Sequence, residues 1–125
     1  NMKLITLLFV IVFSSTLFGQ TLVKRVIKTV EIEEIKTEIK KNDFIILDVR
    51  TPEEFAAGHL KNAININYYD KDFAQRVSSL DKRKKVVVYC AVGGRGGQAL
   101  TKMDALGFQY VLNMKGGYNA WKAQQ

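Results

Sequence analysis

The sequence of 125 residues holds very little cysteine, histidine and proline, with one of each. A single cysteine excludes a disulfide-stapled scaffold, and one cysteine with one histidine cannot form a Cys/His zinc site. One proline and nine glycines exclude collagen-like and low-complexity chains. Charged residues make up 25% and hydrophobic residues 47%, so the chain is neither a disordered tail nor a polytopic membrane protein. We therefore expect one domain held together by a packed core.

The segment 1–19 has the three parts of a secretory signal peptide. Lys3 supplies a positive charge, and the mainly apolar stretch that follows ends at Phe18. That stretch has 15 residues, fewer than the roughly 20 needed to cross a bilayer. We expect cleavage after Gly19, which leaves 20–125 as the mature domain in the periplasm or outside the cell. The alternative is an uncleaved N-terminal anchor, which is also the only membrane contact we expect.

The charge balance is basic, with 19 Lys and Arg against 12 Asp and Glu and a net charge of +7. Four of these cations form one run at 82–85, directly before an apolar strand pattern. Such a run is typical of a solvated connector, so we expect no nucleic-acid binding. A basic surface does attract small anions.

Strand patterns alternate with helix patterns along the rest of the chain. Strands are expected at 25–30, 44–48, 63–66, 86–90 and 110–112. Helices are expected at 31–41, 51–58, 72–80, 98–106 and 117–122. The continuous apolar runs at 44–48 and 86–90 are typical of strands buried on both faces of a parallel sheet. The pattern predicts an α/β fold with a five-stranded, mainly parallel sheet and helices on both faces.

Cys90 stands at the end of the expected strand 86–90, before the glycine-rich segment 91–97. Functional sites of doubly wound sheets lie outside the carboxyl ends of their strands. The four glycines between 93 and 97 allow backbone N–H groups to turn inward as an anion-binding nest, and the next helix adds the positive end of its dipole. We expect Cys90 to ionise more readily than a free thiol and to act as a nucleophile without a histidine base. A buried structural cysteine is the alternative.

Substrate binding is assigned to the loop after the cysteine, which comprises Ala91, Val92, Gly93, Gly94 and Arg95. Arg95, at the far end, can contact a bound anion or pin the loop.

A supporting role is expected for the pair that follows strand 44–48. The carboxylate of Asp48 and the guanidinium of Arg50 can brace the loops there. Thr51, Pro52 and Glu54 form a helix start, with Glu54 closing a capping box, and neither Glu53 nor Glu54 is expected to act as a general acid. His59 is interpreted as structural, because a thiolate mechanism requires no proton shuttle.

Six short motifs resemble the single-domain rhodanese family, in the family's order, over about residues 26–123. They lie at 47–55, 58–60, 63–65, 89–95, 107–108 and 116–121. The resemblance implies the rhodanese fold. It also implies that Cys90 takes a sulfane sulfur from a donor such as thiosulfate, holds it as a persulfide and passes it to cyanide or a thiol. The implied partners are a small sulfur-containing anion and a thiol acceptor, and no metal or organic cofactor is implied.

Loop length distinguishes this interpretation from its nearest rival. Related phosphatases and arsenate reductases place five residues between the cysteine and the arginine, whereas four separate Cys90 from Arg95. The shorter loop favours sulfur chemistry over oxyanion chemistry.

The loop also departs from the family pattern. Where relatives often carry a cation, a hydroxyl residue and a serine, this chain has Ala91, Val92 and Gly96. A missing cation costs a sulfonate one charge-assisted contact, so we expect thiosulfate to be a poor donor while another persulfide remains usable. The non-enzymatic alternative is a sulfur-carrier or interaction module of the same fold.

Overall fold

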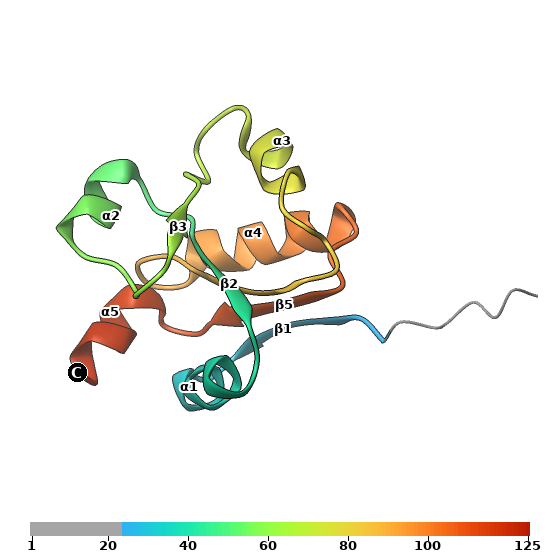
Figure 1. The fold of residues 1–125 in the computed structure, drawn as a ribbon. Coiled ribbons are helices and arrows are strands. Elements are labelled where there is room, and N and C mark those ends of the chain that lie inside the picture. The colour runs from blue at the N-terminus through green and yellow to red at the C-terminus, as the bar shows by residue number, and fades with distance from the viewer. Residues whose placement is uncertain (1–23) are drawn as a thin grey trace, which may run out of the picture.

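The computed structural model describes residues 24–125, so the expected signal peptide at 1–19 lies outside the described residues. Five strands and five helices alternate along this part of the chain (Figure 1). The strands are β1 (Val26–Val30), β2 (Phe44–Asp48), β3 (Ile64–Asn65), β4 (Lys85–Tyr89) and β5 (Tyr110–Met114). The helices are α1 (Ile32–Lys41), α2 (Pro52–Ala57), α3 (Phe73–Ser78), α4 (Gly94–Ala105) and α5 (Gly117–Ala123). None of the helices in 24–125 is long and apolar enough to span a membrane.

The strands form one sheet in the order β1-β5-β4-β2-β3, and every pairing is parallel. The expected α/β sheet of five strands is confirmed, and it is wholly parallel. Three valines of the central strand β4, at 86–88, are fully buried, as its continuous apolar run predicts. Parallel pairing brings the carboxyl ends of β2 and β4 to the same edge of the sheet, where the expected site residues follow each strand.

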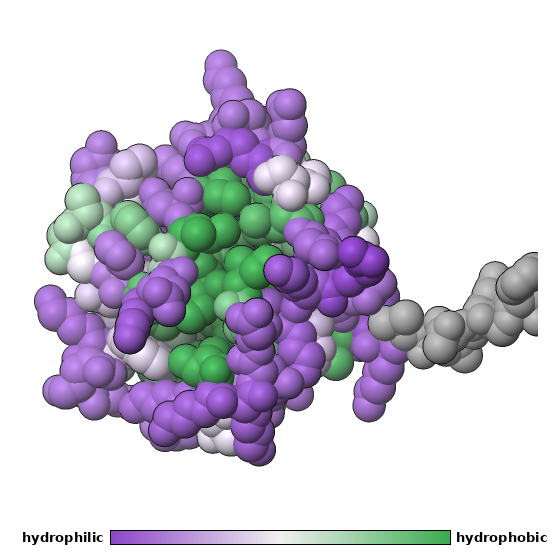
Figure 2. Space-filling view, viewed as in Figure 1, coloured by the Kyte–Doolittle hydropathy of each residue, from purple (hydrophilic) through white to green (hydrophobic). Residues whose placement is uncertain are grey.

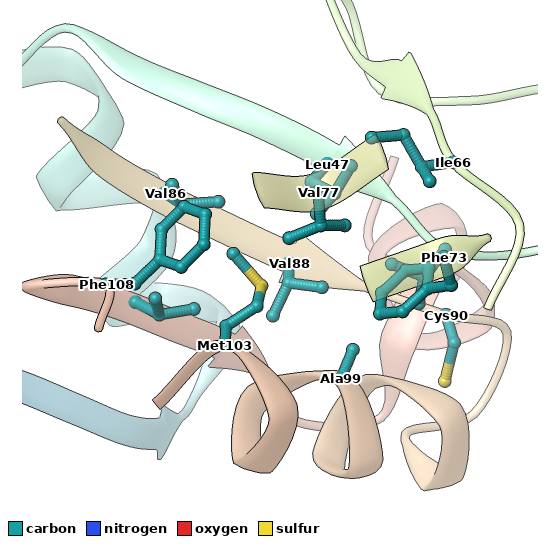
Figure 3. Close-up of a cluster of buried hydrophobic side chains, with 12 residues drawn as sticks. Leu47, Ile66, Phe73, Val77, Val86, Val88, Cys90, Ala99, Met103 and Phe108 are labelled. Atoms are coloured by element: carbon teal, nitrogen blue, oxygen red, sulfur yellow. The ribbon is translucent and has the colours of Figure 1, made fainter. Parts of the chain in front are cut away.

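Two hydrophobic clusters fill the space between the sheet and its helices. The first joins β2 and β4 to Phe73 and Val77 of α3 and to Ala99 and Met103 of α4 (Figure 3). The second joins the opposite sheet face to Ile32 and Ile35 of α1 and to residues of α5. The helices therefore cover both faces of the sheet, as expected.

The edge of β2 that faces β3 is only partly paired. β3 pairs only with Leu47 and Asp48, so no strand of residues 24–125 lies beside Phe44, Ile45 and Ile46 on that side. These three residues are half-buried, and Ile64 of β3 is 41% exposed. Figure 2, which is viewed as in Figure 1, shows apolar surface in the middle of this face, surrounded by hydrophilic side chains.

The start of α4 differs from the sequence-based expectation. The helix begins at Gly94, four residues before the expected start at 98, and the preceding strand ends at Tyr89 rather than at Cys90. Gly93 is the helix N-cap with φ of 119°, and the glycines that follow it are helical. Only one glycine therefore turns the chain, because the helix accommodates the others. Gly96 is glycine for packing, since a Cβ there would overlap Oδ1 of Asn113.

Candidate functional site

Cys90 lies at the carboxyl end of β4, in the turn that leads into α4. The residue is 1% exposed, and its Sγ accepts a hydrogen bond from the backbone N–H of Gly93 at 2.9 Å. Figure 3 shows its sulfur at the end of the first hydrophobic cluster, beside the first turn of α4. The sulfur therefore has a backbone N–H donor beside it and lies at the N-terminus of α4.

The backbone of the cysteine loop is held by the start of α5. The N–H of Tyr118 donates to the Cys90 carbonyl at 2.7 Å, and the N–H of Asn119 donates to the Ala91 carbonyl at 3.0 Å. Gly117 approaches so closely that a Cβ there would overlap both carbonyl oxygens. The start of α5 therefore holds the backbone of the cysteine loop, and the same helix also covers part of the core.

Arg95 is paired with a carboxylate from α2. Its Nη1 and Nη2 donate to Oε1 and Oε2 of Glu54 at 2.6 and 2.9 Å. The arginine side chain is 16% exposed and the glutamate 33%. Hydrogen bonding to Arg95 lowers the pKa of Glu54 to about 2, and the same bonds raise the pKa of Arg95. Of the two roles expected for Arg95, this geometry is the pinning one.

Sequence reasoning placed Glu54 only in the capping box, which the structure contains. The Thr51 hydroxyl accepts from the Glu54 N–H, and the Glu54 carboxylate accepts from the Thr51 N–H. The same carboxylate reaches Arg95 across a separation of 41 residues. No local pattern signals a contact at that distance, so the second role of Glu54 was missed.

Two exposed, largely apolar side chains, Val92 and Tyr69, form the surface that we call the mouth of the cysteine loop. Val92 is 68% exposed, and Tyr69, from the segment between β3 and α3, is 67% exposed. The guanidinium carbon of Arg95 lies 5.5 Å from the Tyr69 ring centroid, a cation–π distance. Tyr69 carried no motif and was not a predicted site residue.

Asp48 and Arg50 form a buried ion pair on the other side of the sheet. Nη2 of Arg50 donates to Oδ2 of Asp48 at 2.7 Å and to the Gly58 carbonyl at 2.6 Å. The guanidinium also lies over the rings of Tyr118 and Tyr89, at 4.3 and 5.6 Å. Burial alone would lower the pKa of Arg50, but hydrogen bonding and charge from Asp48 raise it. The pair braces the chain beneath the cysteine loop through Tyr118 and does not hydrogen-bond to the thiol.

His59 lies on the surface of the α2 region. Its ring stacks on Phe55 with centroids 3.7 Å apart, and its Nδ1 lies 2.8 Å from the Phe55 carbonyl. Both contacts are local, as a structural histidine requires. Within residues 24–125 there is no group of three or more His, Cys, Asp or Glu that could hold a metal ion.

Known proteins share this arrangement of elements. The rhodanese-like domain family matches residues 31–124. HIGH ARSENIC CONTENT 1, a mitochondrial protein of Arabidopsis thaliana, is 42% identical in an alignment of 85 residues that covers 60% of this chain and only 50% of that protein. Thiosulfate sulfurtransferase 16, a chloroplastic protein of the same plant, is 41% identical over 60% of this chain and 71% of its own length. The structure of a human single-domain sulfurtransferase, TSTD1, has a TM-score of 0.67 at 28% identity, covering 78% of this chain and 96% of that one.

Proposed function

The chain belongs to the rhodanese-like domain family, and we propose from this that it is a sulfurtransferase whose Cys90 carries the transferred sulfur as a persulfide. The observation that supports the proposal is the Cys90 sulfur at the carboxyl end of β4, which accepts a hydrogen bond from Gly93 N–H at 2.9 Å. A deprotonated thiol is a nucleophile that needs no histidine base.

The first half-reaction loads sulfur onto the cysteine. The Cys90 thiolate attacks the outer sulfur of a donor, a new S–S bond forms, and the donor's own bond to that sulfur breaks. The electron pair leaves with sulfite when the donor is thiosulfate, or with a thiolate when the donor is an organic persulfide. The N–H of Gly93 and the start of α4 lie beside the Cys90 sulfur. We expect them to stabilise the negative charge on the outer sulfur of the persulfide.

The second half-reaction returns the enzyme to its starting state. An acceptor thiolate or cyanide attacks the outer sulfur of the Cys90 persulfide, and the bond between the two sulfurs breaks. The electron pair returns to Cys90 as thiolate, while the acceptor leaves as a persulfide or thiocyanate. Because each half passes through the same residue, ping-pong kinetics are expected.

Intact-protein mass measurement after incubation with a sulfur donor tests this function. We expect a gain of one sulfur atom, lost again on addition of cyanide and absent from a Cys90→Ser variant. If the protein gains sulfur from an organic persulfide but never passes that sulfur to cyanide or to a thiol, the sulfur-carrier alternative is indicated. No gain from any donor would leave a binding module of the same fold.

Arsenate reduction is the second candidate, because one relative at 42% identity has arsenic in its name. The four residues between Cys90 and Arg95 argue against it, since oxyanion chemistry of this type uses a loop one residue longer. Arsenite production from arsenate by the purified protein, compared with Cys90→Ser, distinguishes the two activities.

We also propose that the domain acts outside the cytoplasm, because segment 1–19 has the composition of a secretory signal peptide. Cell fractionation followed by N-terminal sequencing of the exported protein tests this, with residue 20 as the expected first residue.

A further inference from the structure

Glu54 occupies the Nη1/Nη2 edge of Arg95, the edge that would otherwise bind an anion end-on. The two side chains meet in a bidentate ion pair, Nη1 to Oε1 at 2.6 Å and Nη2 to Oε2 at 2.9 Å. Such parallel pairs are the strongest geometry of guanidinium and carboxylate. The pair is partly shielded from water, with the arginine only 16% exposed. An incoming anion must therefore displace Glu54 before it can bind Arg95 through the same atoms.

Arg95 is the only charged residue in the segment 90–97. Ala91 and Val92 contribute no charge, and Lys115, which lies between β5 and α5, is paired with Glu31 at 2.9 Å. Lys102 of α4 lies over the ring of Tyr68 at 4.8 Å. Because Glu54 neutralises Arg95, a sulfur donor that approaches the loop finds backbone N–H groups but no free cationic side chain within residues 90–97.

Apolar surface borders this neutral loop. Val92 and Tyr69 are 68% and 67% exposed, and Tyr69 lies against Arg95 itself. Thiosulfate carries two negative charges and no carbon, so it gains little from such a rim and lacks a cation to bind. An organic persulfide, R–S–SH, has carbon atoms that can contact Val92 and Tyr69, and it delivers its sulfur without a sulfonate.

We propose that Glu54 is a specificity-determining residue, which by holding Arg95 selects organic persulfides over thiosulfate as the sulfur donor. The inference rests on the proposed sulfurtransferase function and assigns its donor class. With such a donor, the Cys90 thiolate takes the outer sulfur and the donor's thiolate leaves with the electron pair. No step then requires a cation at Arg95.

Glu54→Gln is the sharpest test, because glutamine still closes a capping box with Thr51 but cannot form the ion pair. Initial rates are measured with thiosulfate and with cysteine persulfide as donors. We expect the ratio of kcat/KM for thiosulfate to that for cysteine persulfide to rise about tenfold, the size of one charge-assisted contact. The change is expected in the KM for thiosulfate rather than in its kcat, which a loss of loop structure would not produce.

Glu53→Gln is the matched control. It removes the same charge from the same first turn of α2, and Glu53 forms none of the ion pairs found in residues 24–125. We expect the donor ratio to stay that of the wild type. Glu54→Ala, which loses the cap as well, should melt at a lower temperature yet show the same rise in ratio, separating stability from specificity.

The outcomes distinguish this inference from the proposed function. A wild-type protein that accepts sulfur from cysteine persulfide, combined with an unchanged donor ratio in Glu54→Gln, overturns the inference alone. Equal losses with both donors in Glu54→Gln also overturn it, because Glu54 would then only position the loop. A wild-type protein that accepts sulfur from neither donor overturns both.

Discussion

Gly117 at the start of α5 lies directly against the carbonyl oxygen of Cys90, and no side chain fits between them. Its φ of 63° is also in the left-handed region, which residues with a Cβ adopt at a cost of about 1–2 kcal/mol. Two independent requirements for glycine therefore meet at the residue that supports the reactive loop.

Replacing Gly117 with alanine is expected to disturb the loop and the fold together. The added Cβ collides with the Cys90 and Ala91 carbonyls, so we expect the free energy of unfolding to fall by about 2 kcal/mol or more. Persulfide formation should fall as well, because the hydrogen bonds from Tyr118 and Asn119 hold the same carbonyls. Urea denaturation and intact mass after donor treatment measure the two effects.

Gly97→Ala is the control for that substitution. Gly97 is in α4, and a Cβ there would meet nothing within 4 Å. Alanine should therefore raise the free energy of unfolding by roughly 0.5–1 kcal/mol, the difference in helix propensity. If Gly117→Ala and Gly97→Ala changed the free energy of unfolding equally, the result would contradict the close packing of α5 on the loop.

A double-mutant cycle at Gly96 and Asn113 tests the packing beneath α4. Asn113 Oδ1 is buried without a hydrogen-bond partner among residues 24–125 and lies where a side chain on Gly96 would be. Gly96→Ala alone should cost about 1–3 kcal/mol through overpacking. In an Asn113→Ala background the same change should cost at least about 1 kcal/mol less, because the colliding oxygen is gone. Additive effects in urea denaturation would contradict the contact.

The ion pair of Glu54 predicts a pH dependence of stability. Hydrogen bonding to Arg95 lowers the pKa of Glu54 to about 2 from an ordinary 4.5. A lowered folded-state pKa means that the stabilisation is complete above the unfolded-state value and is lost as pH falls toward 2. The wild type should exceed Glu54→Gln in free energy of unfolding by about 1–2 kcal/mol at pH 6–8, allowing for solvent screening of a partly exposed pair.

That difference should shrink steadily as the pH falls from 4.5 toward 2. Urea denaturation of both proteins at half-unit pH intervals gives the curve directly. A gap that stayed constant down to pH 2.5 would show that the carboxylate of Glu54 gains nothing from Arg95.

Breaking the buried pair beneath the loop should be the most destabilising change. Asp48 is fully buried and Arg50 is 4% exposed, so Asp48→Ala leaves a guanidinium without its counter-charge. We expect a loss of about 3–5 kcal/mol. Asp70→Ala removes an ion pair to Arg76 in which both side chains are about 40% exposed, and should change stability by less than about 1 kcal/mol. Similar thermal melts for the two variants would contradict the bracing role of Asp48.

A cation introduced beside the cysteine should improve the use of thiosulfate. Ala91 is partly exposed at the mouth of the loop, and arginine there could bind the sulfonate through charge-assisted hydrogen bonds. We expect Ala91→Arg to lower the KM for thiosulfate about tenfold, measured as thiocyanate formation with cyanide. Ala91→Gln supplies a similar length without charge, and equal values for the two variants would count against the electrostatic explanation.

Local signals in the sequence predicted what local physics decides. The capping box of Thr51 and Glu54 appears as expected, because its residues are neighbours along the chain. Strands β2 and β4 appear within one residue of their expected ends, since continuous apolar runs leave few other structures, although the first three residues of β2 are only half-buried. The early start of α4 was missed because consecutive glycines indicate a turn, whereas Gly96 is required by the packing of Asn113.

Long-range features of the site could not be inferred in the same way. The contact between Glu54 and Arg95, and the hydrogen bonds from α5 to the cysteine loop, join segments that only the folded sheet brings together. The sequence placed Glu54 in a capping box with Thr51 and residues 117–122 in a terminal helix, and it indicated neither of these long-range contacts. The exposed Tyr69 carries no motif, and its place beside Arg95 depends on the path of the chain between β3 and α3.

The support of the cysteine loop by α5 also has a consequence for the order in which the protein forms. Cys90 is joined to the chain well before Tyr118 and Asn119, whose N–H groups hold the loop. β1 likewise cannot pair until β5 has been made, because β5 is its only neighbour in the sheet described for residues 24–125. During synthesis, nearly thirty residues are therefore added after Cys90 before its loop can take its final form. The surroundings of the thiol are complete only when residues 116–119 have been made and folded.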